Sequence, residues 1–353
     1  MFNTANGNAL TKLSANGASA NAYTSTNITA YYFECVDRFD ENLETLLEFV
    51  SVPFFTDENV ETERGIIEQE ILMCNDDPDH CLYYGFTEAL FEHNALRFPI
   101  AGTVESIQKI TAQTLLDCFN VFYHPSNMVL CVTGDIDTED VRKAARKILP
   151  DGLIDKPLRN YGSPEKLTPA EYKVSKEMDV SLPIFLAGCK VPPPEYGHDS
   201  LRSRLINAMA MDLLAGHSSK LYFRLYNDGL VNSDFSGTYD FSHNAAYAVF
   251  GGEAREPMRV FDEVKKEIRT LSEVGVNSDY FDRVKRALLG GFTRSLNSFE
   301  GISNNIIDGH FLGYDAFNAF NVLSGITRDD IIHFYREHLL TDNMAISIIT
   351  PRG

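Results

Sequence analysis

The chain has 353 residues, of which 44 % are hydrophobic and 23 % charged, a composition typical of globular proteins with about two domains. Its 50 acidic and 31 basic residues give a formal charge of −19, which argues against nucleic acid as a partner because phosphate backbones repel such a chain. It has no apolar run near the roughly 18 residues of a membrane span, no evident signal peptide and six scattered cysteines, so we expect no membrane association and a cytoplasmic location.

The first half alternates strand and helix patterns. Apolar residues spaced by three and four indicate helices, and runs rich in Thr, Tyr and β-branched residues indicate strands. The residues before several helices, such as Thr103 and Thr111, are good caps. The predicted strands are 19–24, 28–36 and 127–133, the last buried on both faces. The predicted helices are 40–50, 61–74, 82–91, 115–123 and 138–149.

The second half follows the same rules and ends in an apolar strand. The predicted strands are 172–180, 183–190, 231–239, 245–251 and 343–349. The predicted helices are 201–214, 220–226, 258–274, 278–297, 301–311 and 328–338.

A stretch rich in Pro and Gly separates the halves. We therefore expect an N-terminal domain at 1–150, a linker at 151–170 and a C-terminal domain at 171–353. The pattern that surrounds Ile110-Thr111 and precedes Asn127-Met128 recurs later in the chain at one constant offset, around Ile326-Thr327 and before Asn343-Met344. The fold class we predict is α+β, with two repeated domains, each a twisted mixed sheet covered by helices.

Two glutamates mark the helix that begins after Thr56-Asp57-Glu58. Glu63 and Glu70 are seven residues apart, nearly two turns, so they project from one face. Val60 and Ile71 lie on or beside that face, which we expect to be packed. Buried carboxylates need a cation, a metal or an open cleft. The alternative is a surface helix with two solvated acids.

In several motifs the chain resembles a known family, the inverted-motif zinc peptidases that include pitrilysin, insulin-degrading enzyme and the mitochondrial processing peptidase. It is most similar to the bacterial half-size members. The order and spacing of the motifs agree along the whole chain. The matching segments are Gly17 to Thr24, Thr29-x-Tyr31-Tyr32-Phe33, Glu63-Arg64-x-Ile66-Ile67-x-x-Glu70-Ile71, Pro99-Ile100-x-Gly102-Thr103-x-Glu105-x-Ile107 and Tyr123-x-Pro125-x-Asn127-Met128 with Gly134-Asp135.

The resemblance implies domains whose sheets carry helices on one face. It also implies an H-x-x-E-H helix with two zinc-binding histidines and a general-base glutamate. By the same resemblance, Glu70 is the third zinc ligand and Glu63 supports the site from behind the ligands. The segment Ala20-Asn21-Ala22 is implied to be an edge strand that pairs with the substrate backbone.

The chain departs from the family because no H-x-x-E-H sequence is present. Met1-Phe2 match the residues directly after the second histidine of the motif. Two explanations stay open: a start assigned too late, so that the first strand and the zinc helix are missing, or a truly short, non-catalytic member. Zinc needs about three protein ligands in a catalytic site. We therefore expect no bound zinc and no peptide cleavage from the printed chain.

A second departure concerns an Arg and a Tyr that the family's second domain often carries after an S-S turn. Ser218-Ser219 match the turn, but the two positions fall on Tyr226 and Asn232, with Arg224 out of phase. The resemblance therefore implies that the chain does not complete its own chamber, and we expect a paired half-size subunit or a homodimer. The two functions we carry forward are a zinc endopeptidase, fragmentary as printed, and a non-catalytic peptide-binding or assembly subunit.

The acidic stretch before His80 is the remaining candidate for a metal cluster. No fixed helical spacing joins its side chains, so we interpret it as a solvated loop. The turn at His217-Ser218-Ser219 is interpreted as a helix cap rather than a serine nucleophile.

Overall fold

The structure is a computed structural model that describes residues 3–150, 152, 155, 157–242 and 244–352. By its internal contacts the chain divides into two compact units. The first unit consists of residues 1–73 and 99–160, and the second of residues 74–98 and 161–353. The chain therefore enters the second unit, returns to the first and enters the second again. The boundaries at 1–150, 151–170 and 171–353 predicted from the sequence contain no such excursion.

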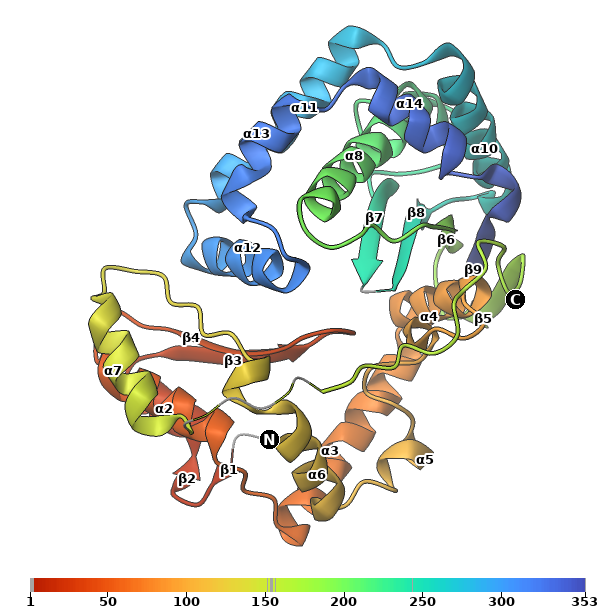
Figure 1. Ribbon diagram of the computed structural model, residues 1–353. Helices are drawn as coiled ribbons and strands as arrows, with labels where there is room; N and C mark the ends of the chain where they lie inside the picture. The colour runs from red at the N-terminus through yellow and green to blue at the C-terminus, as the bar shows by residue number, and fades with distance from the viewer. Residues whose placement is uncertain (1–2, 151, 153–154, 156, 243, 353) are drawn as a thin grey trace. The chain divides into compact units, whose positions relative to one another are not determined.

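The first unit is mostly helical, with two short antiparallel hairpins (Figure 1). Its strands are β1 (Asn3–Thr4), β2 (Gly7–Asn8), β3 (Ser19–Thr24) and β4 (Thr29–Glu34). Its helices are α1 (Ala9–Ala15), α2 (Phe39–Ser51), α3 (Asp57–Asp76, whose last three residues count with the second unit), α5 (Val104–Ile107), α6 (Ala112–Phe122), the 3₁₀ turn η2 (Pro125–Asn127) and α7 (Thr138–Ile148).

Local sequence explains where the helices of the first unit begin. The Thr103 and Thr111 side chains each accept a hydrogen bond from the third residue of the following helix, and both form complete capping boxes. Leu43 and Leu47, four residues apart on α2, are 1 % and 3 % exposed, as expected for an amphipathic helix that packs on its neighbours. The predicted hairpin and caps are therefore confirmed.

The second unit is built on a five-stranded mixed sheet with the strand order β5-β9-β6-β8-β7. Its strands are β5 (Lys173–Met178), β6 (Ile184–Val191), β7 (Ser236–Ser242), β8 (Ala245–Glu253) and β9 (Ala345–Pro351). Only β5 and β9 run parallel, and the other pairs are antiparallel. Its helices are α4 (Pro78–Leu90), α8 (His198–Ala215), α9 (Lys220–Asn227), α10 (Pro257–Val274), α11 (Ser278–Ser295), α12 (Phe299–Leu312), α13 (Ala319–Ser324) and α14 (Arg328–Glu337), with 3₁₀ turns η1 (Ala95–Arg97), η3 (Ala316–Asn318) and η4 (Thr341–Asn343).

Both faces of this sheet are covered. Along β8, Ala246, Ala248 and Phe250 belong to the main core with α8, α10 and α14, whereas Tyr247 and Val249 pack with Phe86 and Leu90 of α4. Successive residues of a strand point to opposite faces, so α4 lies on the face away from α8 (Figure 1). The expectation of helices on one face is therefore wrong for the second unit. The reason is that a helix from the first half of the chain supplies the other layer.

The internal repeat is visible as structure. The sequence offset between Thr111 and Thr327 also relates α6 to α14 and η2 to η4. The two threonines form the same capping box. The hairpin β3–β4 lies at nearly the same offset from β7–β8. These elements occur in the same order in both halves, as the sequence predicted, but the apolar strand expected after η2 is not among the described strands.

The predicted strand at 127–133 is wrong, because these residues form no strand and none of them is fully buried, with Leu130 exposed. Their equivalent in the second half is β9, which pairs with β5 on one side and β6 on the other. A strand needs hydrogen-bonding neighbours. In the described part of the first unit, β3 and β4 pair only with each other, so this apolar run has no strand beside it.

None of the described helices combines the length and the apolar character that a membrane span requires.

Candidate active site

Helix α3 carries the two candidate carboxylates of the first unit. The Asn59 amide donates to Thr56 Oγ1 at 3.2 Å, which caps the helix, and Asp57 and Glu58 occupy its first turn. Val60 and Ile71 are 8 % and 4 % exposed, so one side of the helix is packed as predicted.

The two carboxylates differ in their surroundings. Glu63 is half-buried and has an interaction partner. Glu70 is exposed, and its carboxylate forms no hydrogen bond or ion pair with any residue that the structure describes. Because Glu70 is solvated, it needs no compensating cation. The expectation that Glu70 lies on a packed face of the helix is therefore wrong. The alternative interpretation, a solvated acid on a surface helix, fits Glu70 in this chain.

Arg64, next to Glu63, fixes the helix to the loop that precedes α6. Its Nη2 donates to the Ile110 carbonyl oxygen at 2.8 Å, and its Nη1 pairs with Glu61. The Arg64 side chain is only 17 % exposed, so this bond ties two segments of the first unit beneath the surface. Arg64 therefore has a structural role in the first unit.

Strand β3 offers an open edge. It pairs with β4 through the register Ala20↔Phe33 and Ala22↔Tyr31, and no described strand pairs with its other side. The Ser25 amide donates to the Ile28 carbonyl at 2.8 Å in the turn, so alternation along the ladder directs the backbone groups of Ala20, Ala22 and Thr24 away from β4.

A second contact agrees with this alternation, since the Ala22 amide donates to the Asn21 side-chain oxygen at 2.8 Å instead of to β4. The predicted segment Ala20-Asn21-Ala22 thus lies on an edge that can accept another strand. Thr24 was not among the predicted residues of this edge, although the period of two along the strand points to it.

The described residues do not supply a zinc site. They contain no group of three or more His, Cys, Asp or Glu side chains placed to hold a metal ion. Glu70 offers one carboxylate, whereas zinc in catalytic sites takes about three protein ligands. The donor groups of the described residues therefore do not fit zinc.

In the second unit, Tyr226 and Asn232 stand where the family often has an Arg and a Tyr. Ser219 Oγ accepts a hydrogen bond from the Tyr222 amide at 3.0 Å and caps α9, as predicted for a helix-capping turn. Tyr226 is 52 % exposed on α9, and Asn232 Nδ2 donates to Glu253 at 2.5 Å. Arg224 is paired with Glu263 and Glu267 of α10, so it serves the packing of α9.

The acidic loop before His80 also has a structural role. Asp77 accepts a hydrogen bond from the Asp79 amide at 3.1 Å and caps α4, and the His80 ring packs on Tyr84 with centroids 4.8 Å apart. The interpretation as a solvated loop is therefore corrected to a helix junction, because α3 ends at Asp76 and α4 begins at Pro78.

Two family profiles match the chain and divide it. "Insulinase (Peptidase family M16)" matches residues 3–104, and "Peptidase M16 inactive domain" matches residues 109–288. The uncharacterized zinc protease YmfH of Bacillus subtilis is 34 % identical over 362 aligned positions, which cover 100 % of this chain and 83 % of YmfH. The chain belongs to peptidase family M16. The resemblance seen in its motifs is thereby confirmed.

Other proteins are similar to this M16 chain in sequence or in fold. The uncharacterized zinc protease YmxG of Bacillus subtilis is 23 % identical, with 96 % of this chain and 82 % of YmxG covered. The solved M16-like peptidase of Alicyclobacillus acidocaldarius has a TM-score of 0.94 at 31 % identity and covers 99 % of this chain and 84 % of its own. A protease of Helicobacter pylori, at 17 % identity and a TM-score of 0.88, covers 99 % and 86 % and shows the fold alone. The α+β fold class, with two M16-like domains, is confirmed.

Proposed function

We propose that the printed chain binds extended peptides at the open edge of β3 and does not hydrolyse them by itself. The observation that carries this proposal is the edge formed by Ala20, Ala22 and Thr24, whose outward backbone groups meet no described strand. Binding through main-chain hydrogen bonds tolerates varied side chains. The small Ala20 and Ala22 side chains leave room for a second strand. The isolated carboxylate of Glu70 supports the absence of hydrolysis.

Zinc-dependent hydrolysis belongs, in our proposal, to a form in which two histidines and a general-base glutamate join Glu70. In that form Glu70 is a metal ligand and Glu63 is the group that orients the site. The zinc supplies an activated water when it is bound. Several relatives carry the name zinc protease, which supports this role for the complete site.

The proposed partner, besides a peptide, is a second half-size subunit or another copy of this chain. The support is that Tyr226 and Asn232 stand at the positions of the substrate-binding pair, which this chain therefore does not supply. We propose a cytoplasmic location, because the six cysteines are all free thiols.

The test is fluorescence anisotropy with a labelled, unstructured peptide, with wild type compared to Ala22→Pro. Proline removes the outward N–H of residue 22, so we expect the peptide to bind at least about tenfold more weakly. Ala22→Ser keeps the amide and a small side chain, and it is the matched control with wild-type affinity. Equal affinities for Ala22→Pro and wild type would refute the β3 site.

Hydrolysis is tested separately by mass spectrometry of the incubated peptide and by elemental analysis for zinc. We expect an intact peptide and far less than one zinc per chain. One zinc per chain, with cleavage that a chelator abolishes, would overturn the non-catalytic assignment and leave the β3 edge to be judged by the binding result.

A further inference from the structure

Within the second unit, a polar network fastens the C-terminal end of α4 to the segment that leads into β5. Residues 91–94 follow α4 directly, and their turn lies against the segment 161–171, which leads into β5. The Glu171 amide donates to the Ala89 carbonyl at 2.9 Å, and the Ala170 amide donates to the Leu90 carbonyl at 3.3 Å. These bonds satisfy carbonyl groups that the end of a helix leaves free.

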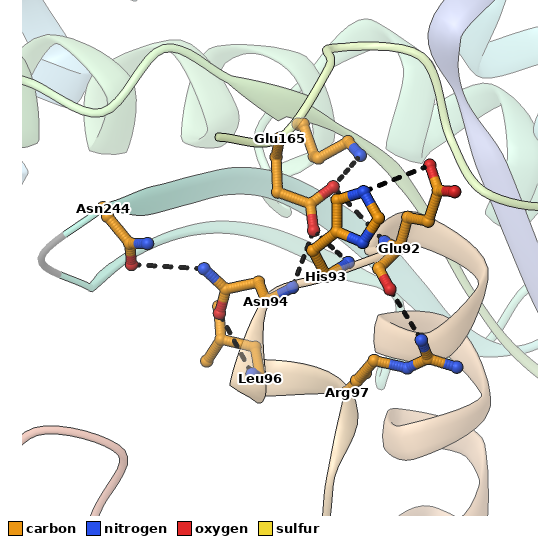
Figure 2. A network of polar contacts seen from close by, with 8 residues as sticks. Glu92, His93, Asn94, Leu96, Arg97, Glu165 and Asn244 are labelled. Carbon is orange, nitrogen blue, oxygen red and sulfur yellow. Dashed lines mark hydrogen bonds and ion pairs between the residues drawn. The ribbon is translucent and has the colours of Figure 1, made fainter. Parts of the chain in front are cut away.

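Three consecutive backbone amides after α4 converge on one carboxylate. The His93 and Asn94 amides donate to Glu165 Oε1 at 2.6 and 2.7 Å, and the Glu92 amide donates to Oε2 at 3.2 Å (Figure 2). Successive N–H groups of this kind form a concave anion site, called a nest, and the nest made by the amides of residues 92–94 is filled by a side chain of the same protein. The Glu165 side chain is only 9 % exposed.

A fourth donor completes the shell of this carboxylate. Lys190 Nζ, at the end of β6, lies 3.0 Å from Glu165 Oε2 and 5.4 Å from the centre of the Phe91 ring. The Lys190 side chain is 4 % exposed, and Glu165 is its anionic partner within the described chain. Burial of an unpaired ammonium is strongly unfavourable. Lys190 therefore depends on Glu165 to stay dry.

The other charged groups around the turn point elsewhere. Glu92 and His93 pair with each other at 3.8 Å with exposed side chains, and Arg97 Nη1 donates to the Glu92 carbonyl at 2.7 Å. The Asn94 side-chain amide donates a hydrogen bond of 3.1 Å to the side-chain oxygen of Asn244, and both groups are uncharged. Glu165 is thus the charged group that joins three segments: the turn after α4, the linker and β6 (Figure 2).

We infer that Glu165 is a positioning residue that latches the end of α4 to the segment 161–171 and to β6 within the second unit, and that its loss opens residues 91–94 while the sheet stays folded. The opening is driven from two sides, because three amides lose their acceptor and Lys190 must reach water. The rest of α4 stays docked through Leu82 and Phe86, which are 4 % and 0 % exposed. This inference does not rest on peptide binding at β3.

The test is hydrogen exchange at single-residue resolution on the full chain, with Glu165→Ala. We expect the Glu92, His93 and Asn94 amides to exchange about 10- to 100-fold faster, the range implied by a lost hydrogen bond to a charged group. Amides of β6 and β8 should change by less than about threefold, since they report the stability of the sheet. Glu171→Gln, an exposed neighbour, is the matched control and should change nothing.

Two further variants separate the nest from the ion pair. Glu165→Gln keeps an acceptor oxygen but loses the charge, so the three amides should exchange at rates between those of wild type and Glu165→Ala. Lys190→Met keeps the carboxylate in its nest, so the same amides should stay protected. Faster exchange in Lys190→Met than in Glu165→Ala would overturn the role of the nest.

Unchanged protection of residues 92–94 in Glu165→Ala would refute the latch. An equal rise at every amide of the second unit would also refute it, because that result describes a merely structural residue. Should Glu165→Ala not fold, Glu165→Gln combined with Lys190→Met removes both charges and leaves an acceptor. In that protein the sheet should be protected as in wild type, with residues 92–94 less protected, and full protection of the turn would contradict the proposal.

Discussion

Helices α6 and α14 occupy equivalent places in the two halves, yet they meet different surroundings. Ile331, Phe334 and Tyr335 of α14 are 0 %, 2 % and 2 % exposed, and the Tyr335 hydroxyl donates to the Ala210 carbonyl of α8. No residue of α6 is fully buried, although the helix has a distinct apolar side. In the second unit the long helix α8 precedes the β7–β8 hairpin. In the described part of the first unit, the helix before the β3–β4 hairpin is the short α1. An amphipathic pattern thus sets which side of a helix faces inward, and the neighbouring elements decide whether that side is buried.

The largest test of this comparison uses Ile331 and Leu115, which hold equivalent positions in the repeat. Ile331→Ala should lower the free energy of unfolding of the second unit by about 2–5 kcal/mol, because it opens a cavity in a closed core. Leu115→Ala should cost about 1 kcal/mol or less, because its site is already partly hydrated. Urea unfolding followed by circular dichroism measures both. Equal losses would show that the first unit has a core as closed as the second.

A smaller effect is expected from acid at the latch of the second unit. Burial acts to raise the pKa of Glu165, but hydrogen bonds from the His93 amide, Lys190 and the Asn94 and Glu92 amides outweigh it, so the pKa lies below its ordinary value. The folded state then binds fewer protons than the unfolded state in acid. The contribution of Glu165 is present above its unfolded pKa of about 4.3 and is lost as the pH falls through the folded pKa.

The measurement is the free energy of unfolding of wild type and Glu165→Gln between neutral and acidic pH. The difference between the two proteins should shrink as the pH falls, because the protonated carboxyl resembles the amide. Glu171→Gln, the exposed neighbour, serves as the control variant. A difference that is constant with pH would contradict the lowered pKa.

The smallest effects should come from one substitution with opposite signs in the two units. Gly85 of α4 faces β9, and a Cβ there would lie 2.7 Å from Ser347 Oγ, whereas a Cβ at Gly65 of α3 would meet nothing within 4 Å. Gly65→Ala should stabilise the chain by up to about 1 kcal/mol through helix propensity. Gly85→Ala should destabilise it by about 1 kcal/mol through overpacking.

Thermal unfolding by circular dichroism reports both signs. Ser347→Ala removes the clashing oxygen, so adding it to Gly85→Ala should recover the loss. Stabilisation by Gly85→Ala alone would mean that α4 lies farther from the sheet than described.

Much of the fold could be predicted because local signals and packing agree. Thr111 and Thr327 cap their helices as their sequence positions indicate, and the Thr- and Tyr-rich run at 19–34 forms the predicted hairpin. The failures lie where a long-range partner decides. Residues 128–133 have the composition of a strand but no neighbouring strand among the described residues, and α4 has an ordinary helical pattern that does not reveal which sheet it covers.

The candidate site was predictable to a similar degree. The strand at 19–24 follows from the residue pattern, and its edge position at Ala20-Asn21-Ala22 was implied by the family resemblance; β3 pairs with β4 alone among the described strands. The exposure of Glu70 depends on neighbouring side chains that the pattern does not encode. The bond between Glu165 and the amides of residues 92–94 joins positions 71 to 73 apart, and no spacing rule connects them. Single residues that bridge remote segments stay beyond the reach of periodicity.

The passage of residues 74–98 through the second unit constrains how the polypeptide can be divided. A cut between residues 151 and 160 leaves α4 on the N-terminal piece and all five strands of the large sheet on the C-terminal piece. Expressed alone, the C-terminal piece would expose the apolar surface around Tyr247 and Val249 to water, a surface prone to self-association. Producing the halves separately therefore removes the α4 layer from the five-stranded sheet, although the sheet itself lies wholly in the C-terminal half.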